Sequence, residues 1–315
     1  MVAGFDASRR EALTWLLAAA SAACGMQVQA QEPASGSVPG LLMRPIPHSG
    51  EHLPAVGLGT AIVFDVGTTQ AQRAGPESVV QSLISHGGTL IDTAPSYGQA
   101  ESVLGDILTK SGQRKRVFLS TKLEHESFAD EPGGLQMSLR RLQTNRVDLL
   151  QLHNVRDPKQ SLAALRALKM QGLCRYTGIT TTFGRAYQAA EAIVKRERPD
   201  FIEIDYAIDN RDAENRVLPA ARDAGTAVLV ALPFGRGRLF RLALGKPLPE
   251  WAAEFDCHSW AQFFLKWVLS NPTVTAAIPG TDKASHMVDN LGAALGRLPD
   301  APTRAKMLQY VQGLT

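Results

Sequence analysis

The chain has 315 residues, of which 44% are hydrophobic and 20% charged, and its formal net charge is +3. This composition is typical of a globular protein with an ample core, arranged as one large or two small domains. No run of lysine and arginine interleaves with aromatic residues, which argues against a nucleic-acid partner. Beyond the N-terminal region no apolar run is as long as a bilayer span, so we expect no stable membrane span.

The N-terminal region has the features of an export signal. Arg9 and Arg10 stand directly before a mild apolar run that ends at Cys24, and small residues follow up to Ala30. Paired arginines, a short apolar region and a small-residue cleavage site are typical of twin-arginine signal peptides. We therefore expect residues 1–30 to be removed and the folded protein to reach the periplasm through the twin-arginine export machinery. The alternatives are an ordinary amphipathic helix and a lipid-attachment site at Cys24.

The remaining chain divides into a linker and one domain. Residues 31–41 are small, polar and rich in proline and glycine, which indicates a linker, and residues 42–315 are expected to form a single domain. This domain opens with a predicted hairpin over residues 43–54. Cys174 and Cys257 lie far apart in the sequence, so we expect buried free thiols rather than a disulfide framework.

After the hairpin, short apolar runs alternate with longer segments of helical spacing. The runs cover residues 55–60, 89–92, 117–121, 147–153, 176–180, 201–206, 227–232 and 274–279. Residues 161–169 and 259–269 show the spacing of one buried helix face, and Asn271-Pro272 is expected to end the second helix. Eight such units predict parallel pairing and an α/β fold, a single-domain (β/α)8 TIM barrel with a short N-terminal β-hairpin. An open doubly wound sheet is the alternative, but no G-x-G-x-x-G follows the first run.

Four ionisable residues stand at the ends of these runs. Asp92 ends one run, Tyr97 follows it across a turn, Lys122 follows the next run and His153 ends a third. Because a barrel brings the C-terminal ends of its strands to one mouth, we expect these side chains to lie together. Each alone has an ordinary structural interpretation, such as a turn cap or a surface lysine. Their common position at strand ends favours a catalytic site.

This set of side chains suits carbonyl reduction. A carbonyl that accepts hydride develops alkoxide character and needs a proton donor at its oxygen. Tyr97 is a weak acid, and a nearby Lys122 ammonium favours its ionised form, so we expect a lowered tyrosine pKa. Asp92 would keep the lysine protonated, and His153 would position the carbonyl through a hydrogen bond.

The same segments resemble the aldo-keto reductase superfamily. The resemblance rests on Asp-Thr-Ala-Pro-Ser-Tyr-Gly at 92–98, Ser-Thr-Lys at 120–122 and Asp-Leu-Leu-Gln-Leu-His at 148–153, and it covers about residues 43–298. It implies that the four residues above are the family's catalytic Asp, Tyr, Lys and His. It also implies a (β/α)8 barrel that binds a nicotinamide cofactor without a Rossmann domain. Hydride would pass from nicotinamide C4 to a small carbonyl or sugar substrate while the tyrosine protonates the oxygen.

The resemblance carries over unevenly to the nicotinamide end of a cofactor site. Where the family commonly has Ser-Asn to bind the carboxamide, this chain has Thr180-Thr181, which keeps a hydroxyl but lacks the amide. Glu203 replaces the family's Gln or Asn, and the aromatic that stacks on nicotinamide is replaced at Ala231 or Leu232. The residues assigned to this end of the cofactor are Gly59, Thr60, Thr180, Thr181 and Glu203.

Two further segments are assigned to the cofactor's phosphates and adenosine. The loop 233–239 matches the family's pyrophosphate-covering loop, and its glycines and arginines suit a phosphate, although a flexible surface loop is the alternative. Many NADP-preferring members have Lys and Arg at positions 280 and 286, where this chain has the weaker ligands Gly280 and His286, and Lys283 would compensate. NADP(H) is slightly favoured over NAD(H) as the family default. The residues assigned here are Pro233, Phe234, Gly237, Leu239, Gly280, Thr281, His286 and Asn290.

The leading hypothesis is therefore an NAD(P)(H)-dependent aldo-keto oxidoreductase. One alternative is a cofactor-binding regulatory or sensor protein with little turnover, which the altered carboxamide and stacking positions leave open. A second alternative is a lyase in which Lys122 forms a Schiff base with a carbonyl substrate. We assign no metal ligands, and the sequence does not predict an oligomeric state.

Overall fold

The computed structural model describes residues 40–124 and 134–314. The expected signal peptide and nearly all of the expected linker lie outside the described residues. Pro39–Thr315 forms one compact unit. Among the described residues, no helix is long and apolar enough to cross a membrane.

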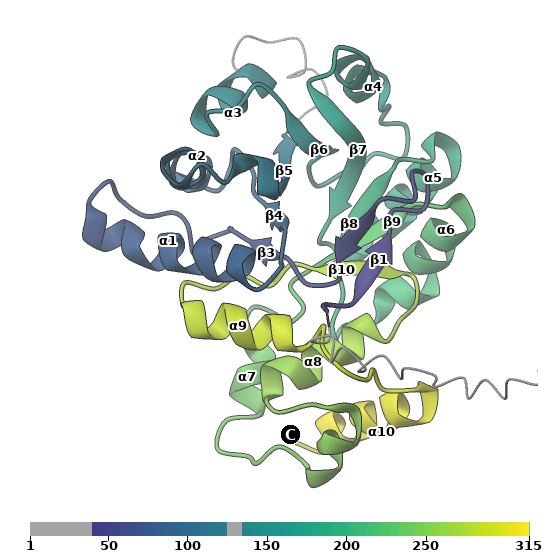
Figure 1. Cartoon of the computed structure of the whole chain (residues 1–315). Helices are drawn as coiled ribbons and strands as arrows, with labels where there is room; N and C mark the ends of the chain where they lie inside the picture. The colour runs from purple at the N-terminus through teal and green to yellow at the C-terminus, as the bar shows by residue number, and fades with distance from the viewer. Residues whose placement is uncertain (1–39, 125–133, 315) are drawn as a thin grey trace, which may run out of the picture. The chain divides into compact units, whose positions relative to one another are not determined.

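The centre of this unit is a sheet of eight parallel strands (Figure 1). The strands follow one another in chain order around the sheet, each hydrogen-bonded to the next. Backbone bridges from Val56 to Ala277 and from Gly59 to Gly280 bring the last strand beside the first, so the barrel is nearly closed. The expected (β/α)8 fold is confirmed. The strands are β3 (Leu58–Gly59), β4 (Leu90–Asp92), β5 (Phe118–Leu123), β6 (Val147–Leu152), β7 (Cys174–Thr181), β8 (Phe201–Asp205), β9 (Ala227–Ala231) and β10 (Val274–Ala277).

Each predicted apolar run overlaps one strand, and two of the differences in length are instructive. β3 is far shorter than its run, because the preceding residues hydrogen-bond to β10 instead of β4, as Gly57 N does to Ala277 O at 2.8 Å. β5 continues past its run because Lys122 and Leu123 pair with β6. Lys122 therefore lies inside a strand rather than just after one.

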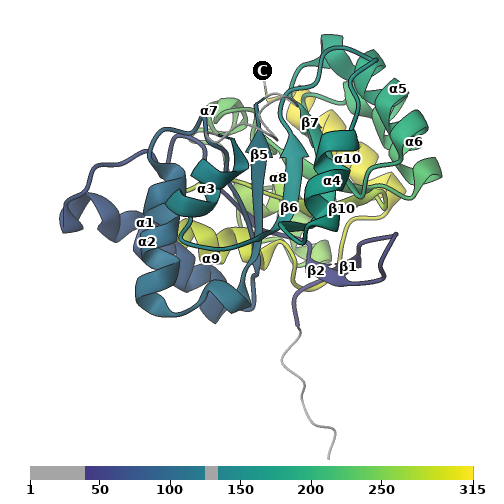
Figure 2. The ribbon, with the colours of Figure 1, turned by 90° about the horizontal axis from the view of Figure 1, so that it is seen from above.

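Helices surround the strands in both views (Figures 1 and 2). They are α1 (Gln70–Ser85), α2 (Ala100–Ser111), α3 (Leu135–Arg141), α4 (Ala163–Met170), α5 (Tyr187–Glu197), α6 (Val217–Ala224), α7 (Arg238–Leu242), α8 (Trp260–Leu269), α9 (Ala284–Gly292) and α10 (Ala301–Gln312). The two helices predicted from spacing correspond to α4 and α8. Ser259 caps α8 by accepting a hydrogen bond from Gln262 N, and the helix ends just before Asn271-Pro272, as expected.

The predicted hairpin closes the end of the barrel opposite the strand C-termini. It consists of β1 (Met43–Pro45) paired with β2 (His52–Pro54). Ile46 and Leu53 are fully buried in a cluster with side chains from the beginnings of the strands, including Leu90 and Phe118. Because this end is filled by apolar side chains, the mouth at the C-terminal strand ends is the one that remains open for a site.

Candidate active site

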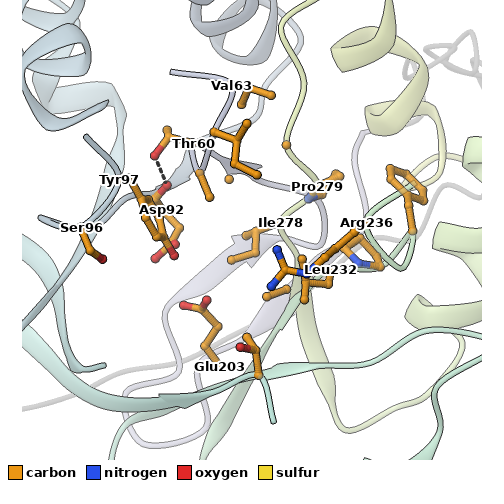
Figure 3. A pocket seen from close by; sticks show the side chains of 18 of the residues that line it. Thr60, Val63, Asp92, Ser96, Tyr97, Glu203, Leu232, Arg236, Ile278 and Pro279 are labelled. Carbon is orange, nitrogen blue, oxygen red and sulfur yellow. Dashed lines mark hydrogen bonds between the residues drawn. The ribbon is translucent and has the colours of Figure 1, made fainter. Parts of the chain in front are cut away.

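A cavity of about 690 Å³ opens at the C-terminal ends of the strands. Tyr97, Asp92 and Glu203 line one part of it, and Leu232 and Arg236 from the loop after β9 line another (Figure 3). His153, at the end of β6, also contributes to the wall. Three of the four predicted catalytic residues therefore face one space, and Lys122 lies directly behind them.

Asp92 and Lys122 form a buried ion pair beneath the cavity. The ammonium is in short contact with the Asp92 carboxylate and donates a second hydrogen bond to Thr93 O at 3.1 Å. Ser120 Oγ donates to Asp92 Oδ1 at 2.7 Å, and Thr60 Oγ1 donates to the Asp92 carbonyl at 2.9 Å (Figure 3). The register that pairs Asp92 with Ser120 across β4 and β5 places these groups side by side.

A second carboxylate completes this charge cluster. Glu203 on β8 is only 3% exposed, and its Oε2 lies 3.3 Å from Lys122 Nζ. Gln151 Nε2 donates to the same oxygen at 2.9 Å and also to Ser120 Oγ at 3.2 Å. Gln151 thus links the surroundings of the two carboxylates. The sequence predicted neither this link nor a direct contact between Glu203 and Lys122.

The charge states follow from burial and from these neighbours. Burial opposes the charge on Lys122, but Asp92 and Glu203 outweigh it and raise the pKa of the lysine. Burial, together with the Glu203 charge, raises the pKa of Asp92, and Lys122 opposes this. Lys122 therefore keeps its proton as an ammonium and is not a nucleophilic amine. Such an ammonium does not attack a carbonyl, which disfavours the Schiff-base lyase.

Tyr97 lies above the ammonium, with Lys122 Nζ 5.1 Å from the centre of the tyrosine ring. Burial is the largest influence and raises the pKa of Tyr97, while Lys122 lowers it and the carboxylates of Glu203 and Asp92 raise it. The expectation of a lowered tyrosine pKa is therefore wrong. The lysine reduces the increase without reversing it, because its charge is balanced by two carboxylates.

His153 stands edge-on to Tyr97, with the ring centres 6.0 Å apart. Its Nδ1 lies 2.9 Å from Glu124 Oε1, and the hydrogen bond lowers the pKa of the Glu124 carboxyl. A carboxylate partner keeps a proton on Nδ1, so the imidazole has a fixed tautomer. The second ring nitrogen then accepts a hydrogen bond when the ring is neutral and donates one when it is protonated.

The predicted cofactor residues divide into two groups by position. One group lines the cavity: Gly59, Thr60, Glu203, Pro233, Phe234, Gly237 and Gly280. Gly59 and Gly280 are bridged directly, and a Cβ on Gly59 would lie 2.7 Å from Ile278 O. A side chain at that position would disrupt the closure of the barrel. Gly59 is therefore required by the fold, and it also lines the cavity.

The other group lies outside the lining of this cavity, as far as the described residues define it. It consists of Thr180, Thr181, Leu239, Thr281, His286 and Asn290. Thr180 and Thr181 are buried, and the Thr180 hydroxyl accepts a hydrogen bond from Asn154 N at 2.8 Å. His286 is exposed on α9. The two threonines support the wall from behind instead of presenting their hydroxyls to the cavity.

Asn154 is a residue of the wall that the sequence did not suggest. It follows His153 directly, lines the cavity and has φ 52°. Its Oδ1 is buried without a hydrogen-bond partner among the described residues. A buried orphan oxygen is costly, so a polar group that enters the cavity would be drawn to it. The positive φ, which asparagine tolerates, is visible only in the structure.

The two arginines that follow β9 have different partners. Arg238 Nε lies 2.6 Å from Asp209 Oδ2, so its charge is already paired. Arg236 has φ 55° and lines the cavity. Figure 3 shows its side chain extending toward Glu203 across the space.

Among the described residues, no group of three or more His, Cys, Asp and Glu side chains is placed to hold a metal ion.

Comparisons with known proteins agree with this geometry. The model of the aldo/keto reductase family matches residues 55–304. Methylglyoxal reductase YeaE of Escherichia coli (strain K12) is 31% identical over 245 residues, which cover 76% of this chain and 84% of that protein. The solved aldo-keto reductase from Klebsiella pneumoniae in complex with NADPH is 26% identical, with a TM-score of 0.71 over 86% of this chain and 95% of that one. A Klebsiella pneumoniae structure with NADP and acetate has a TM-score of 0.68 at 26% identity, over 85% and 95% of the two chains.

The fold and site thus define a (β/α)8 barrel enzyme with a Tyr, Lys, Asp and His group at its mouth. The chain belongs to the aldo/keto reductase family, and it is an oxidoreductase.

Proposed function

We propose that this protein transfers hydride between a nicotinamide nucleotide and a small carbonyl or alcohol, with Tyr97 as the proton donor. The observation that carries the proposal is the buried Asp92–Lys122 pair directly beneath Tyr97, at a cavity that His153 also lines. A phenol with a permanent cation behind it suits a site where negative charge develops on a carbonyl oxygen.

The cavity has groups that fit a nicotinamide nucleotide. The orphan Oδ1 of Asn154 is an acceptor for a carboxamide NH2, a role for which the sequence offered only Thr180-Thr181. Arg236, beside Gly237 in the cavity wall, suits a phosphate. When bound, the nucleotide supplies or accepts the hydride.

The chain's own residues then manage the proton. Burial keeps Tyr97 protonated before the reaction, so the proton is available when the carbonyl oxygen becomes basic. The Lys122 ammonium stabilises the tyrosinate left behind, and the two carboxylates keep the lysine charged throughout. When its ring is protonated, His153 donates the hydrogen bond that orients the carbonyl oxygen toward the phenol.

For the cofactor we propose NADP(H) over NAD(H), supported by the two Klebsiella structures that hold NADPH and NADP. Lys283 and His286 lie at and just after the start of α9, where a 2′-phosphate would be neutralised. For the substrate we propose small aldehydes and ketones, a class that includes the methylglyoxal named for the Escherichia coli relative.

We also propose that residues 1–30 direct export of the folded protein to the periplasm, which would allow a cofactor to travel already bound.

The test is to titrate the purified protein with NADPH and NADH and follow nicotinamide absorbance across carbonyls and alcohols, including methylglyoxal. We expect saturable binding, with NADPH the tighter ligand, and oxidation of NADPH by at least one small carbonyl. Binding with no turnover across a wide panel would favour the regulatory or sensor alternative. Absence of binding by either nucleotide would contradict the proposal.

A further inference from the structure

The cavity wall includes a carboxylate that proton donation by Tyr97 does not require. Glu203 lines the cavity near its floor and is 3% exposed. Its Oε2 lies 3.3 Å from Lys122 Nζ and accepts a hydrogen bond from Gln151 Nε2 at 2.9 Å. An oxygen that lies beside an ammonium and accepts an amide N–H is satisfied as a carboxylate.

The floor of the cavity is formed by Asp92 and Glu203, with the buried Lys122 beneath them, and the charges of these three residues do not cancel. Asp92 and Glu203 contribute two negative charges, and the Lys122 ammonium between them contributes one positive charge. Asp65 adds a further carboxylate to the lining. Arg236 is the other charged side chain that faces Glu203 in Figure 3, and a bound pyrophosphate would engage it. With a dinucleotide in place, the floor therefore keeps an excess of negative charge.

Hydride transfer places the nicotinamide ring close to this charge. The reacting carbons must approach to about 3–3.5 Å, and the carbonyl oxygen must reach the Tyr97 hydroxyl. Lys122 Nζ lies 5.1 Å from the Tyr97 ring centre and 3.3 Å from Glu203, and both residues face the same cavity. A ring in reacting position is thus a near neighbour of the Glu203 carboxylate.

The two redox states of the ring respond differently to such a neighbour. The oxidised nicotinamide ring carries a positive charge, and the reduced ring is neutral. A fixed negative charge a few ångströms away stabilises the oxidised form and has little effect on the reduced form. The family resemblance leads us to expect a Gln or Asn at this position. Such a residue has no net charge, so it does not stabilise the oxidised ring relative to the reduced ring in this way.

We propose that Glu203 is a specificity-determining residue that shifts the binding preference of this site toward the oxidised nucleotide. The inference rests on the proposed function, because it requires nicotinamide binding in this cavity. Its consequence is that the bound reduced nucleotide is a stronger hydride donor. The oxidised nucleotide also leaves more slowly than it would from a site with a neutral residue at position 203.

The test is to measure the Kd of NADP+ and of NADPH by calorimetric titration for the wild type and for Glu203→Gln. We expect the ratio Kd(NADP+)/Kd(NADPH) to rise about tenfold in the variant, the order expected for loss of one nearby charge in a protein site. The matched control is Glu191→Gln, the same chemical change on α5, where Glu191 pairs with Lys195 and Arg216 on the surface. Its ratio should equal that of the wild type.

Two smaller substitutions keep the test decisive if Glu203→Gln does not fold. Glu203→Asp keeps the charge and should keep the wild-type ratio, whereas Glu203→Asn, which has the same size as Asp, should raise the ratio. A ratio within twofold of wild type in the neutral variants would overturn the role of Glu203 and leave the proposed function standing. If the wild type binds neither nucleotide, the proposed function fails as well.

Discussion

At the scale of single residues, the cavity floor combines a phenol, one ammonium and two carboxylates. Burial raises the pKa of Tyr97, and the ammonium of Lys122 moderates that increase. The balance keeps the proton on the phenol, and in the proposed reaction the developing alkoxide draws it away. Lys122 also has a structural role, because its ammonium contacts both carboxylates.

This structural role predicts how replacement of Lys122 changes the free energy of unfolding. Lys122→Met leaves the carboxylates of Asp92 and Glu203 buried without their cation, which should lower the free energy of unfolding by about 3–5 kcal/mol. The double variant Lys122→Met/Glu203→Gln should recover part of the loss, because one of the two uncompensated charges is gone. Urea unfolding of the single and double variants measures both effects. Equal stability of Lys122→Met and the wild type would contradict this account of the cluster.

At the scale of elements, the two ends of the barrel have separate tasks. The β1–β2 hairpin fills one end with apolar side chains such as Ile46, which is fully buried. The loops after the strands form the other end, where Ile62 is 78% exposed and lines the cavity. Ile62 also has φ 69°, an unusual conformation for a β-branched residue that places an apolar side chain at the rim.

This separation predicts opposite effects for two isoleucine variants. Ile46→Ala should lower the free energy of unfolding by about 2–5 kcal/mol and leave the KM for substrate unchanged. Ile62→Ala should change stability little, because the side chain is exposed, and should alter KM. Thermal unfolding and steady-state kinetics on both variants make the comparison. An altered KM in Ile46→Ala at a temperature where it is folded would argue against the division of tasks.

The sequence indicated much of this arrangement because its signals are local. Each strand is a short apolar run, and each predicted catalytic residue stands near the C-terminal end of one, so the barrel and the meeting of these residues at its mouth could be predicted together. Gln151 could not, since its contacts with Ser120 and Glu203 depend on the register of β6 against its neighbours. Asn154 was missed for a similar reason, because its orphan oxygen and positive φ arise from tertiary structure.

At the scale of the whole molecule, a single barrel buries both cysteines of the described chain. Cys174 and Cys257 are free and buried, as predicted. Burial raises the pKa of Cys174 to about 12 and that of Cys257 to about 11, above the usual value of about 8.5. The native protein therefore retains thiol protons that the unfolded chain releases at alkaline pH. This contribution to stability is complete below about pH 8.5 and is lost as the pH rises toward the native values.

These buried thiols should be unreactive until the barrel unfolds. With Cys24 replaced by serine, we expect almost no reaction with a thiol reagent such as 5,5′-dithiobis(2-nitrobenzoate) at pH 8, and two thiols per chain after unfolding in urea. Rapid labelling of either cysteine in the native protein would show that the barrel opens far more readily than its packing implies.

The central claim is that Tyr97 donates the proton while the nucleotide carries the hydride. Tyr97→Phe removes the phenolic proton and keeps the ring that packs above Lys122. We expect the rate of carbonyl reduction to fall by about 10²–10⁴-fold, the usual contribution of a positioned acid. The Kd for NADPH, measured on the same preparation, should stay within about twofold of wild type, since the hydroxyl is not needed to hold the nucleotide. Unchanged turnover in Tyr97→Phe would contradict the account.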